Sequence, residues 1–580
     1  MRRKPGIEAG RRGTSGPWRE GHGERDDAFD EPLQILPRST MSLFDYIVIG
    51  SGSAGAIIAA RLSEDPTISV LLLEAGRRDD HPFMAMPIAF PRVANSPRYV
   101  WPYETEPEPG LLERRLPVWR GRTLGGCSSI NAMINVRGNR GDYDLWARSG
   151  LEGWAYRDVL PYFRKLETSW RGAGAYHGGD GPVGNVLVDR PETCFTHLEQ
   201  AAREAGLAVC ADQNGEVQDG ISRVEVTTNA SRRASSARAY LRPAMKARRN
   251  LTVRTGAQAT RILFEGRRAV GVDYLRGSRP ARARASREII LSAGTYASPQ
   301  LLMLSGIGPA DDLRALGIDV VQDLPGVGEN LQEHPNLLNI YRTRGKIGLT
   351  RYLRLDRAAL SVLRWALLRD GPFATAGTMA NIFMRSRPDR QVPDIQIITM
   401  PVHQYAGLWF PGLTPAPTFA FTARVGILHA RSRGWVKLRS ADPLDLPRIR
   451  FNMFTDPADM PAMIEAVRLS RALFDKPSMR ALIAEELLPG KDLHDDAALD
   501  RAIREQAEHR HHACGTCRMG LDAMAVVDAQ LRVRGVEGLR VADASIMPDD
   551  PSGNTNVPTL MIGEKAADLI RGRTLPPADV

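Results

Sequence analysis

A glycine turn between a short apolar run and a stretch of small residues is the feature that most constrains this chain. Residues 44–65 read FDYIVIGSGSAGAIIAARLSED, in which Gly50, Gly52 and Gly55 form the pattern G-x-G-x-x-G. The first glycine permits a tight turn, the second lets a pyrophosphate approach the backbone, and the third lets the following helix pack closely on the strand. The pattern predicts a strand–turn–helix unit that binds an anion at the start of its helix.

A second apolar run, residues 68–76, follows the predicted helix and carries Glu74 near its end. This carboxylate lies about 20 residues beyond the glycine pattern, where an acid accepts hydrogen bonds from an adenosine ribose. A carboxylate there disfavours the 2′-phosphate of NADP, so FAD and NAD remain. The alternative is a glycine turn with a surface glutamate, but the order of strand, loop, helix, strand and acid argues against it. We therefore expect a dinucleotide site.

Composition narrows the class of protein. The chain has 580 residues, of which 43% are apolar and 25% charged, which is typical of a globular enzyme. Its net charge of +10 comes from scattered arginines rather than a basic helix, so we expect no nucleic-acid partner. The cysteines are few and odd in number, which argues against a disulfide framework and indicates a reducing, cytoplasmic location. No run of about 18 apolar residues predicts a membrane-spanning helix.

The start of the chain differs in composition from the rest. Residues 1–41 are polar, rich in Gly and Pro and mixed in charge, and they lack the apolar segment of a signal peptide. We expect them to form a disordered extension. Met41 stands directly before the first convincing strand, so the alternative is that translation starts there and the extension is not made.

Two further stretches rich in Gly and Ser flank apolar runs, at residues 121–147 and 292–309. Small side chains there would let backbone amides line an extended ligand; the alternative is a pair of tight turns. The two stretches resemble the signature patterns of the glucose–methanol–choline (GMC) oxidoreductases, FAD enzymes that oxidise alcohols. Further blocks resemble the same family in the family's order, at residues 153–167, 176–183, 323–335 and 552–570. The resemblance runs from about Phe44 to about Arg571 and is nearest the bacterial choline dehydrogenase and alcohol dehydrogenase branch.

The resemblance implies an α/β fold, α+β overall, with two discontinuous domains. A Rossmann-like FAD-binding domain would be built from residues 42–160, 225–325 and 505–575. A substrate-binding domain, an antiparallel sheet backed by helices, would take residues 161–224 and 326–504. Strands of that sheet are expected within residues 393–402, 419–430 and 434–440, and a helix near the C-terminus within residues 557–570.

The resemblance also implies how FAD is held. Some members attach the flavin covalently through a histidine, but Ile130 stands at that position, so we expect non-covalent FAD. The residues expected to bind it are Gly50, Gly52, Ser53, Gly55, Glu74, Arg122, Thr123, Gly125, Gly126, Ser129, Asn131, Ala132, Ala259, Asp543, Ala544, Asn556 and Val557.

Residues 509–520 read HRHHACGTCRMG and concentrate histidine and cysteine. The spacing does not resemble that of a usual zinc site, and a redox pair of Cys514 and Cys517 would belong near the first strand of its fold. We interpret both cysteines as packing residues and expect no metal. By resemblance to the family block His-Pro-x-Gly-Thr-x-x-Met-Gly, His512 is the active-site base, although Ala513 replaces the usual proline.

Alcohol oxidation explains these residue types. The resemblance makes Asn554, in the block SGNTNVP, the catalytic partner of His512. Imidazole, with an ordinary pKa of about 6.5, can take a hydroxyl proton at neutral pH, and an amide can donate a hydrogen bond to an oxygen that gains negative charge. We therefore expect FAD-dependent oxidation of a primary alcohol to the aldehyde, with proton abstraction at His512 and hydride transfer to flavin N5.

Substrate and electron acceptor stay open at this point. Choline would need an aromatic or acidic pocket, to which His403, Tyr405, Trp409 and Phe410 could contribute; the same side chains could cap an alkanol. Electrons would pass to a quinone or another carrier, and oxygen is the alternative that would make the protein an oxidase. A quinone would favour peripheral contact with the inner membrane, but no amphipathic anchor is evident. A hydroxynitrile lyase on the same scaffold and a catalytically silent FAD-binding protein are the competing interpretations.

Overall fold

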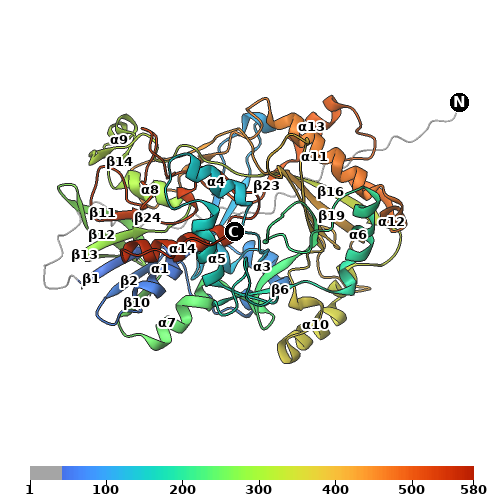
Figure 1. Ribbon diagram of the computed structural model, residues 1–580, viewed down its shortest axis with the longest axis horizontal. Helices are drawn as coiled ribbons and strands as arrows, with labels where there is room; N and C mark the ends of the chain where they lie inside the picture. The colour runs from blue at the N-terminus through green and yellow to red at the C-terminus, as the bar shows by residue number, and fades with distance from the viewer. Residues whose placement is uncertain (1–41) are drawn as a thin grey trace. The chain divides into compact units, whose positions relative to one another are not determined.

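The glycine turn follows an inner strand of a mixed seven-stranded sheet (Figure 1). The computed structural model describes residues 42–580; the predicted extension 1–41 and the alternative start at Met41 lie outside the described residues. The strands are β1 Ser42–Ile49, β2 Val70–Glu74, β10 Leu251–Thr255, β11 Ala257–Glu265, β12 Arg268–Arg276, β13 Arg279–Leu291 and β24 Leu539–Val541. Their order is β10-β2-β1-β13-β12-β11, with β24 also paired to β13.

The central part of this sheet is parallel. β1 lies between β2 and β13, and β10 and β24 also run parallel to their neighbours, whereas β11 and β12 form an antiparallel ribbon. Ile47, Val48, Leu71 and Leu72, on alternating faces of β1 and β2, are all fully buried. Continuous apolar strands of this kind are typical of a parallel sheet covered on both faces. The predicted α/β fold with a Rossmann-like sheet is confirmed.

Two helices from opposite ends of the described chain pack against each other beside this sheet (Figure 1). They are α1, Gly55–Leu62, and α14, Asn556–Ile570, and both are almost wholly buried. Small residues permit the close approach, because a Cβ on Gly563 would lie 2.9 Å from the Cα of Ala54. α14 begins one residue before the helix predicted from the sequence.

A buried carboxylate joins α14 to the elements around it. Glu564 of α14 accepts a hydrogen bond of 2.8 Å from the guanidinium of Arg61 on α1 and one of 2.7 Å from the hydroxyl of Tyr240. The ammonium of Lys165 lies 3.1 Å from the same carboxylate. Because the Glu564 side chain is fully buried, these partners hold a charge that would otherwise be very costly to remove from water.

The second sheet is antiparallel throughout and also has seven strands. They are β7 Gly220–Arg223, β16 Pro335–Thr343, β17 Ala380–Met384, β18 Ile395–Met400, β19 Ala420–Ile427, β22 Ile483–Leu488 and β23 Glu508–His509. Alternate residues of β19, such as Phe421, Ala423 and Val425, pack in one core cluster with α6, Phe195–Glu204, and α11, Asp459–Phe474. The residues between them, such as Arg424, lie on the opposite face of the sheet.

The sequence placed two of the three expected strands of this sheet correctly, as β18 and β19. The third expected strand, within residues 434–440, also forms, but it does not belong to this sheet. Only β20, Trp435–Lys437, is a strand there, and it pairs with β21, Arg448–Arg450, in a separate ribbon, because the Asp- and Pro-containing turn between them returns the chain at once. The division into two domains stays a prediction; residues 42–580 form one unit by their contacts, and β23 pairs with β16 across the predicted boundary.

Among residues 42–580, no helix combines the length and the apolar character needed to cross a membrane.

Replacing Gly55 by alanine tests the predicted close approach of helix and turn. The added Cβ would lie 2.0 Å from the carbonyl oxygen of Gly50 and 2.9 Å from the Cβ of Ser292, so backbone must move. We expect a loss of stability of about 3 kcal/mol or more, together with loss of FAD from the purified protein. Thermal unfolding and the ratio of flavin to protein absorbance measure both. Gly174→Ala is the control, because no atom lies within 4 Å of its added Cβ; equal behaviour of the two variants would contradict the assignment.

Candidate active site

A cavity of about 1240 Å³ extends from the glycine turn to the second sheet. Its wall includes Gly50 and Glu74 of the first sheet and Ile398 of the second. His512 and Asn554 also lie in the wall. The cavity therefore connects the predicted nucleotide site with the predicted catalytic pair.

Most residues predicted to bind FAD reach this cavity. Those in its wall are Gly50, Gly52, Ser53, Glu74, Gly126, Asn131, Ala132, Ala259, Asp543, Ala544 and Asn556. Six others stand behind it: Gly55, Arg122, Thr123, Gly125, Ser129 and Val557. One of them, Ser129, stabilises the loop behind the wall, because its hydroxyl donates to the carbonyl of Leu124 at 2.7 Å.

The Glu74 carboxylate is held rigidly at the nucleotide end. One oxygen accepts from the amide of Ser51 at 3.0 Å and from its hydroxyl at 2.6 Å, and the other accepts from the amide of Gly76 at 2.7 Å. Burial raises the pKa of Glu74, while these hydrogen bonds oppose the rise. A carboxylate has about four lone-pair sites, so it can still accept a hydrogen bond from a ribose hydroxyl.

Arg233 holds the wall loop that contains Asn131, and sequence reasoning missed it. Its guanidinium donates to the carbonyl and side-chain oxygens of Asn131 at 2.7 and 2.8 Å, and to the carbonyls of Ser128 and Met84 at 3.2 and 3.0 Å. Burial lowers the pKa of Arg233 to about 9. A single arginine in a stretch rich in Ala and Ser carries no pattern, so nothing in the sequence marked it.

His512 and Asn554 form a pair at the cavity wall. The Asn554 amide nitrogen lies 2.9 Å from Nε2 of His512, and its oxygen accepts from the Gln396 amide at 3.3 Å. On the other side of the ring, Nδ1 of His512 lies 2.9 Å from Nδ1 of His334, which is fully buried. Burial and neighbouring positive groups hold the pKa of His512 well below its usual value, and burial lowers the pKa of His334 to about 3.

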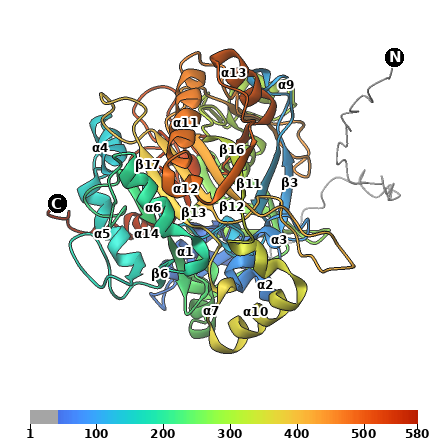
Figure 2. The same ribbon diagram turned by 90° about the vertical axis from the view of Figure 1, so that its right-hand side faces the viewer.

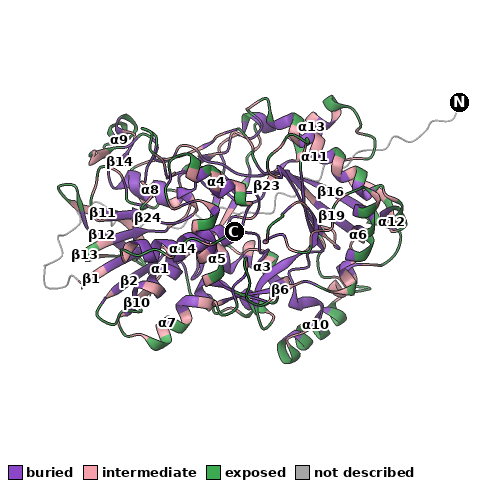
Figure 3. Cartoon of the chain, viewed as in Figure 1, coloured by how far each residue is buried: buried purple, intermediate pink, exposed green. Residues whose placement is uncertain are grey.

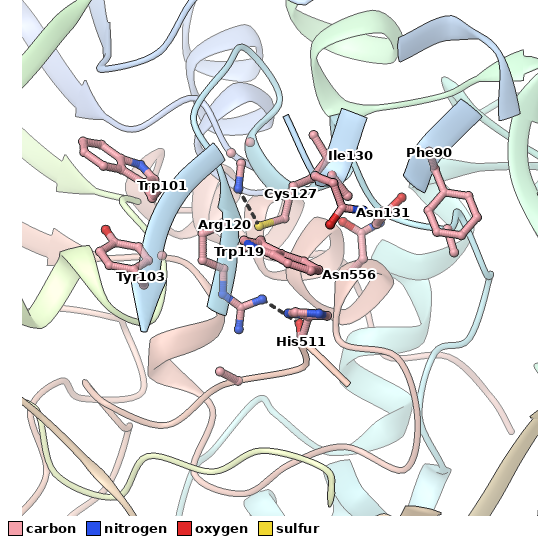
Figure 4. Close-up of a pocket in the computed structure, with 18 of the residues that line it drawn as sticks. Phe90, Trp101, Tyr103, Trp119, Arg120, Cys127, Ile130, Asn131, His511 and Asn556 are labelled. Carbon is pink, nitrogen blue, oxygen red and sulfur yellow. Dashed lines mark hydrogen bonds between the residues drawn. The ribbon is translucent and has the colours of Figure 1, made fainter. Parts of the chain in front are cut away.

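The buried Glu333 carboxylate organises the histidine-rich stretch. One oxygen accepts from the backbone amides of His512 at 2.8 Å and His334 at 3.0 Å, and the other lies 3.2 Å from Nδ1 of His509. Burial raises the pKa of Glu333, but contact with His509 more than offsets this effect, so the pKa lies below its usual value. Figure 4 shows the ring of His511 against Trp119, and the guanidinium of Arg120 directed at the His511 carbonyl, a contact of 2.6 Å.

The cysteines of this stretch are buried free thiols. Burial raises the pKa of both Cys514 and Cys517 well above the usual thiol value, which makes them poor nucleophiles. The Cys514 thiol donates to the buried carboxyl of Asp550, whose other oxygen lies 3.6 Å from Nε2 of His334. Within the described part of the chain, no group of three or more His, Cys, Asp or Glu residues is arranged to hold a metal ion.

Arg233→Met tests the support of the wall loop. The variant leaves buried carbonyl oxygens without a donor, each at a cost of about 1–3 kcal/mol, so we expect FAD affinity to fall at least 10-fold and the melting temperature to fall. Fluorescence titration of apoprotein with FAD measures the first effect. Arg267→Met, at an exposed position, is the control. Wild-type FAD affinity in Arg233→Met would contradict the proposed support.

Comparison with known proteins agrees with this geometry. Two family models described as GMC oxidoreductase match residues 44–336 and 430–563. The chain is 45% identical over 537 residues to the oxygen-dependent choline dehydrogenase of Paraburkholderia phymatum, covering 91% of this chain and 93% of that protein. It is 44% identical over 540 residues to the protein of the same description from Escherichia coli O17:K52:H18, covering 91% and 96%.

Solved structures share the fold over nearly the whole length. Pyridoxine 4-oxidase from Mesorbium loti matches with a TM-score of 0.80 and 31% identity, covering 90% of this chain and 98% of that one. Formate oxidase of Aspergillus oryzae RIB40 matches with a TM-score of 0.85 and 28% identity, covering 92% and 98%. The sequence matches the family models and the curated relatives over most of the chain, and the fold matches solved structures over the same length. This chain therefore belongs to the GMC oxidoreductases, a family of FAD-binding enzymes, and is similar to their choline dehydrogenases.

Proposed function

We propose that this protein oxidises a primary alcohol, choline-like or an alkanol, to the aldehyde. The observation that carries the proposal is the pairing of His512 Nε2 with the Asn554 amide in the wall of the cavity that begins at the glycine turn. An alcohol hydroxyl that replaces this contact can donate to Nε2 and accept from the amide. Choline dehydrogenases among the relatives support an alcohol as substrate.

The cavity wall fits non-covalent FAD. A Cβ on Gly52 would meet only one neighbouring atom within 4 Å, at 3.9 Å, which leaves room for a ligand at the turn. Glu74 would hold the ribose and the loop around Asn131 would face the flavin. Ile130 has a hydrocarbon side chain that cannot form a bond to the cofactor. When bound, FAD supplies the hydride acceptor for the reaction.

The hydrogen bonds around His512 favour a neutral base. Because Asn554 donates to Nε2, that nitrogen keeps its lone pair, and the ring proton lies on Nδ1, directed at Nδ1 of His334. His334, with its lowered pKa, is neutral and accepts this hydrogen bond. His512 is thus prepared to take a proton at Nε2, and Asn554 to stabilise the oxygen that loses it.

His512→Ala tests the role of the base. We expect bound FAD to remain and the rate of anaerobic flavin reduction by an alcohol to fall by about 10²–10⁴-fold. In the wild type, the lowered pKa keeps His512 unprotonated at neutral pH, so the rate should be flat above pH 6.5 and fall only on the acidic side. Stopped-flow absorbance from pH 5 to 9 measures both.

Two outcomes would contradict the function. Unchanged reduction in His512→Ala would exclude this residue as the base. No flavin reduction by any alcohol in the wild type would instead favour a hydroxynitrile lyase or a silent FAD-binding protein. In Asn554→Ala, we expect the rate of flavin reduction to decrease by roughly 10²-fold, because the alcohol oxygen loses one hydrogen-bond donor.

We propose a quinone as electron acceptor, taken from a membrane surface, and an exposed helix supports this. In α10, Leu355–Leu368, the buried residues are Ala358, Ser361 and Trp365, whereas Leu360, Leu367 and Leu368 are 66%, 71% and 70% exposed. Figure 2 shows α10 at the lower edge of the molecule next to α2, Pro82–Ala85, and Figure 3 shows its outer side as largely exposed. The apolar side of this helix thus faces solvent.

Charge around α10 fits an anionic bilayer. Residues 346–370 contain six basic side chains and two aspartates. Leucines flanked by basic residues are typical of helices that lie in the membrane interface. Ala358 and Val362 of α10 also line the cavity, so the cavity extends to this helix. Oxygen is the alternative acceptor, since the curated relatives are called oxygen-dependent.

Vesicle binding tests the membrane contact. The holoenzyme should co-sediment with vesicles containing phosphatidylglycerol but not with pure phosphatidylcholine, because the surface is basic. Leu360→Asp combined with Leu367→Asp should abolish binding and leave the reduction of flavin by alcohols unchanged. Leu521→Asp, at a leucine that is 64% exposed elsewhere, is the control. If the wild type does not bind vesicles but self-associates, and the double variant does not self-associate, the exposed surface of α10 binds a second copy of this chain. That result would contradict the proposal.

A further inference from the structure

The substrate end of the cavity is rich in positive charge. Among the residues that line the whole cavity, the arginines are Arg92, Arg114, Arg115, Arg120, Arg424 and Arg510, and the acids are Glu74, Asp445, Glu508 and Asp543. Glu74 and Asp543 belong to the predicted FAD site, where Asp543 accepts hydrogen bonds from the Gly294 amide and the Ser298 hydroxyl. The Pro443 carbonyl, near Asp445, accepts a hydrogen bond from Gln258, beside the predicted adenine position. Glu508, on β23 of the second sheet, is therefore the acid that faces the substrate end.

Arg424 stands out because its charge has no partner. It lies on β19 with its side chain on the face opposite Phe421, Ala423 and Val425, whose side chains pack in the core. It lines the cavity, and within residues 42–580 its guanidinium makes no hydrogen bond or ion pair. Burial lowers its pKa, while the more distant charge of Glu508 opposes this effect.

Arg510 adds a second charge that no carboxylate neutralises directly. Its guanidinium donates to the carbonyls of Gln396 and Arg424 at 2.6 and 2.7 Å and to the side-chain oxygens of Gln396 and Asn336 at 2.5 and 3.4 Å. All four acceptors are neutral, and burial lowers the pKa of Arg510 to about 9. These contacts use the donors of Arg510, so it contributes a fixed positive field, whereas Arg424 has free donors.

Such a site is ill-suited to a quaternary ammonium group. Glu508 is its one facing acid; it accepts a hydrogen bond of 3.3 Å from the Tyr405 hydroxyl, and its charge already acts on Arg114 and Arg424. A trimethylammonium group there would meet net repulsion. A carboxylate, by contrast, would supply the planar acceptor that a free guanidinium binds with two parallel hydrogen bonds.

The sheet sets the spacing between this charge and the catalytic pair. Gln396 of β18 contacts Asn554, and Ile398, two residues further along the same face, is the register partner of Arg424 on β19. Two residues of a strand span roughly 7 Å. Ile398 lines the cavity at the level of Arg424, and Met400 lines it two residues further on, so the group that connects hydroxyl and anion should be apolar.

We propose that the substrate is a hydroxy acid: a primary alcohol with a carboxylate at the other end of a short apolar chain, bound through Arg424. The inference rests on the proposed alcohol oxidation and names its substrate class. It adds no chemical step, because the carboxylate only binds and the alcohol is oxidised to the aldehyde as before. Within the proposed alcohol oxidation, this inference favours a hydroxy acid over the choline-like alcohol that similarity to the choline dehydrogenases suggests.

Flavin reduction by matched alcohols tests this preference. The holoenzyme is mixed anaerobically with 6-hydroxyhexanoate, 1-hexanol or choline. We expect the lowest apparent Kd for the hydroxy acid and the slowest reduction by choline. Arg424→Met should raise the apparent Kd for 6-hydroxyhexanoate by roughly 10- to 100-fold and leave that for 1-hexanol within about 3-fold. Arg115→Met is the control, because its side chain also lines the cavity but is 46% exposed and lies 3.6 Å from Glu106.

A second readout separates this inference from the proposed function. Hexanoate has no hydroxyl to oxidise, so calorimetry with it measures binding alone. Binding to the wild type and not to Arg424→Met supports the carboxylate site even if turnover is slow. The inference would be overturned if choline reduced the flavin fastest and hexanoate either did not bind the wild type or bound Arg424→Met equally well. Alcohol oxidation would still stand in that case. Hexanoate binding at Arg424 without reduction by any alcohol would overturn the proposed function instead.

Discussion

The buried charge cluster around Glu564 holds the two ends of the described chain together, and the cavity depends on that joint. Arg61, Lys165 and Tyr240 all contact this carboxylate, and removing one partner of such a buried pair typically costs about 3–5 kcal/mol. α14 is thereby pressed onto α1, directly after the glycine turn. At its start, Asn556 accepts a hydrogen bond of 2.8 Å from the Ser53 hydroxyl of that turn. Asn554, the predicted catalytic partner of His512, reaches the cavity wall because this helix is docked.

A second buried carboxylate, Glu333, positions the other member of the pair. By accepting from the backbone of His512 and His334 and contacting His509, it fixes the stretch in which Ala513 replaces the family's proline. The hydrogen bonds of Glu333 can provide the local rigidity that a proline would otherwise supply. Glu564 thus positions Asn554, and Glu333 positions His512, so that both side chains lie in the same wall of the cavity.

The arginines at the substrate end of the cavity connect the proposed substrate preference with the pKa of His512. Burial is the main cause of the low pKa of His512, and after His334 the charges of Arg510, Arg120 and Arg424 lower it further. A bound carboxylate would offset the charge of Arg424, so the pKa of His512 would rise when the proposed substrate enters. The base would then be strongest when a hydroxy acid is present, whereas a cationic substrate would weaken it further. In this arrangement Arg424 would bind the carboxylate of the substrate and would also make the pKa of His512 depend on whether that substrate is bound.

The sequence by itself determined the local units: the β1–turn–α1–β2 unit with Glu74, the helix α14 to within one residue, and strands β18 and β19. Periodicity and glycine chemistry act over a few residues, so they can be read without the fold. The pairing of His512 with Asn554 was predicted from family resemblance alone. Only the tertiary structure decided the partner of β20, the outward apolar face of α10, and the places of Arg233, Glu333 and Arg424. Single charged residues carry no pattern in sequence; whether such a residue is paired, buried or free is decided by segments hundreds of positions away that the fold brings beside it.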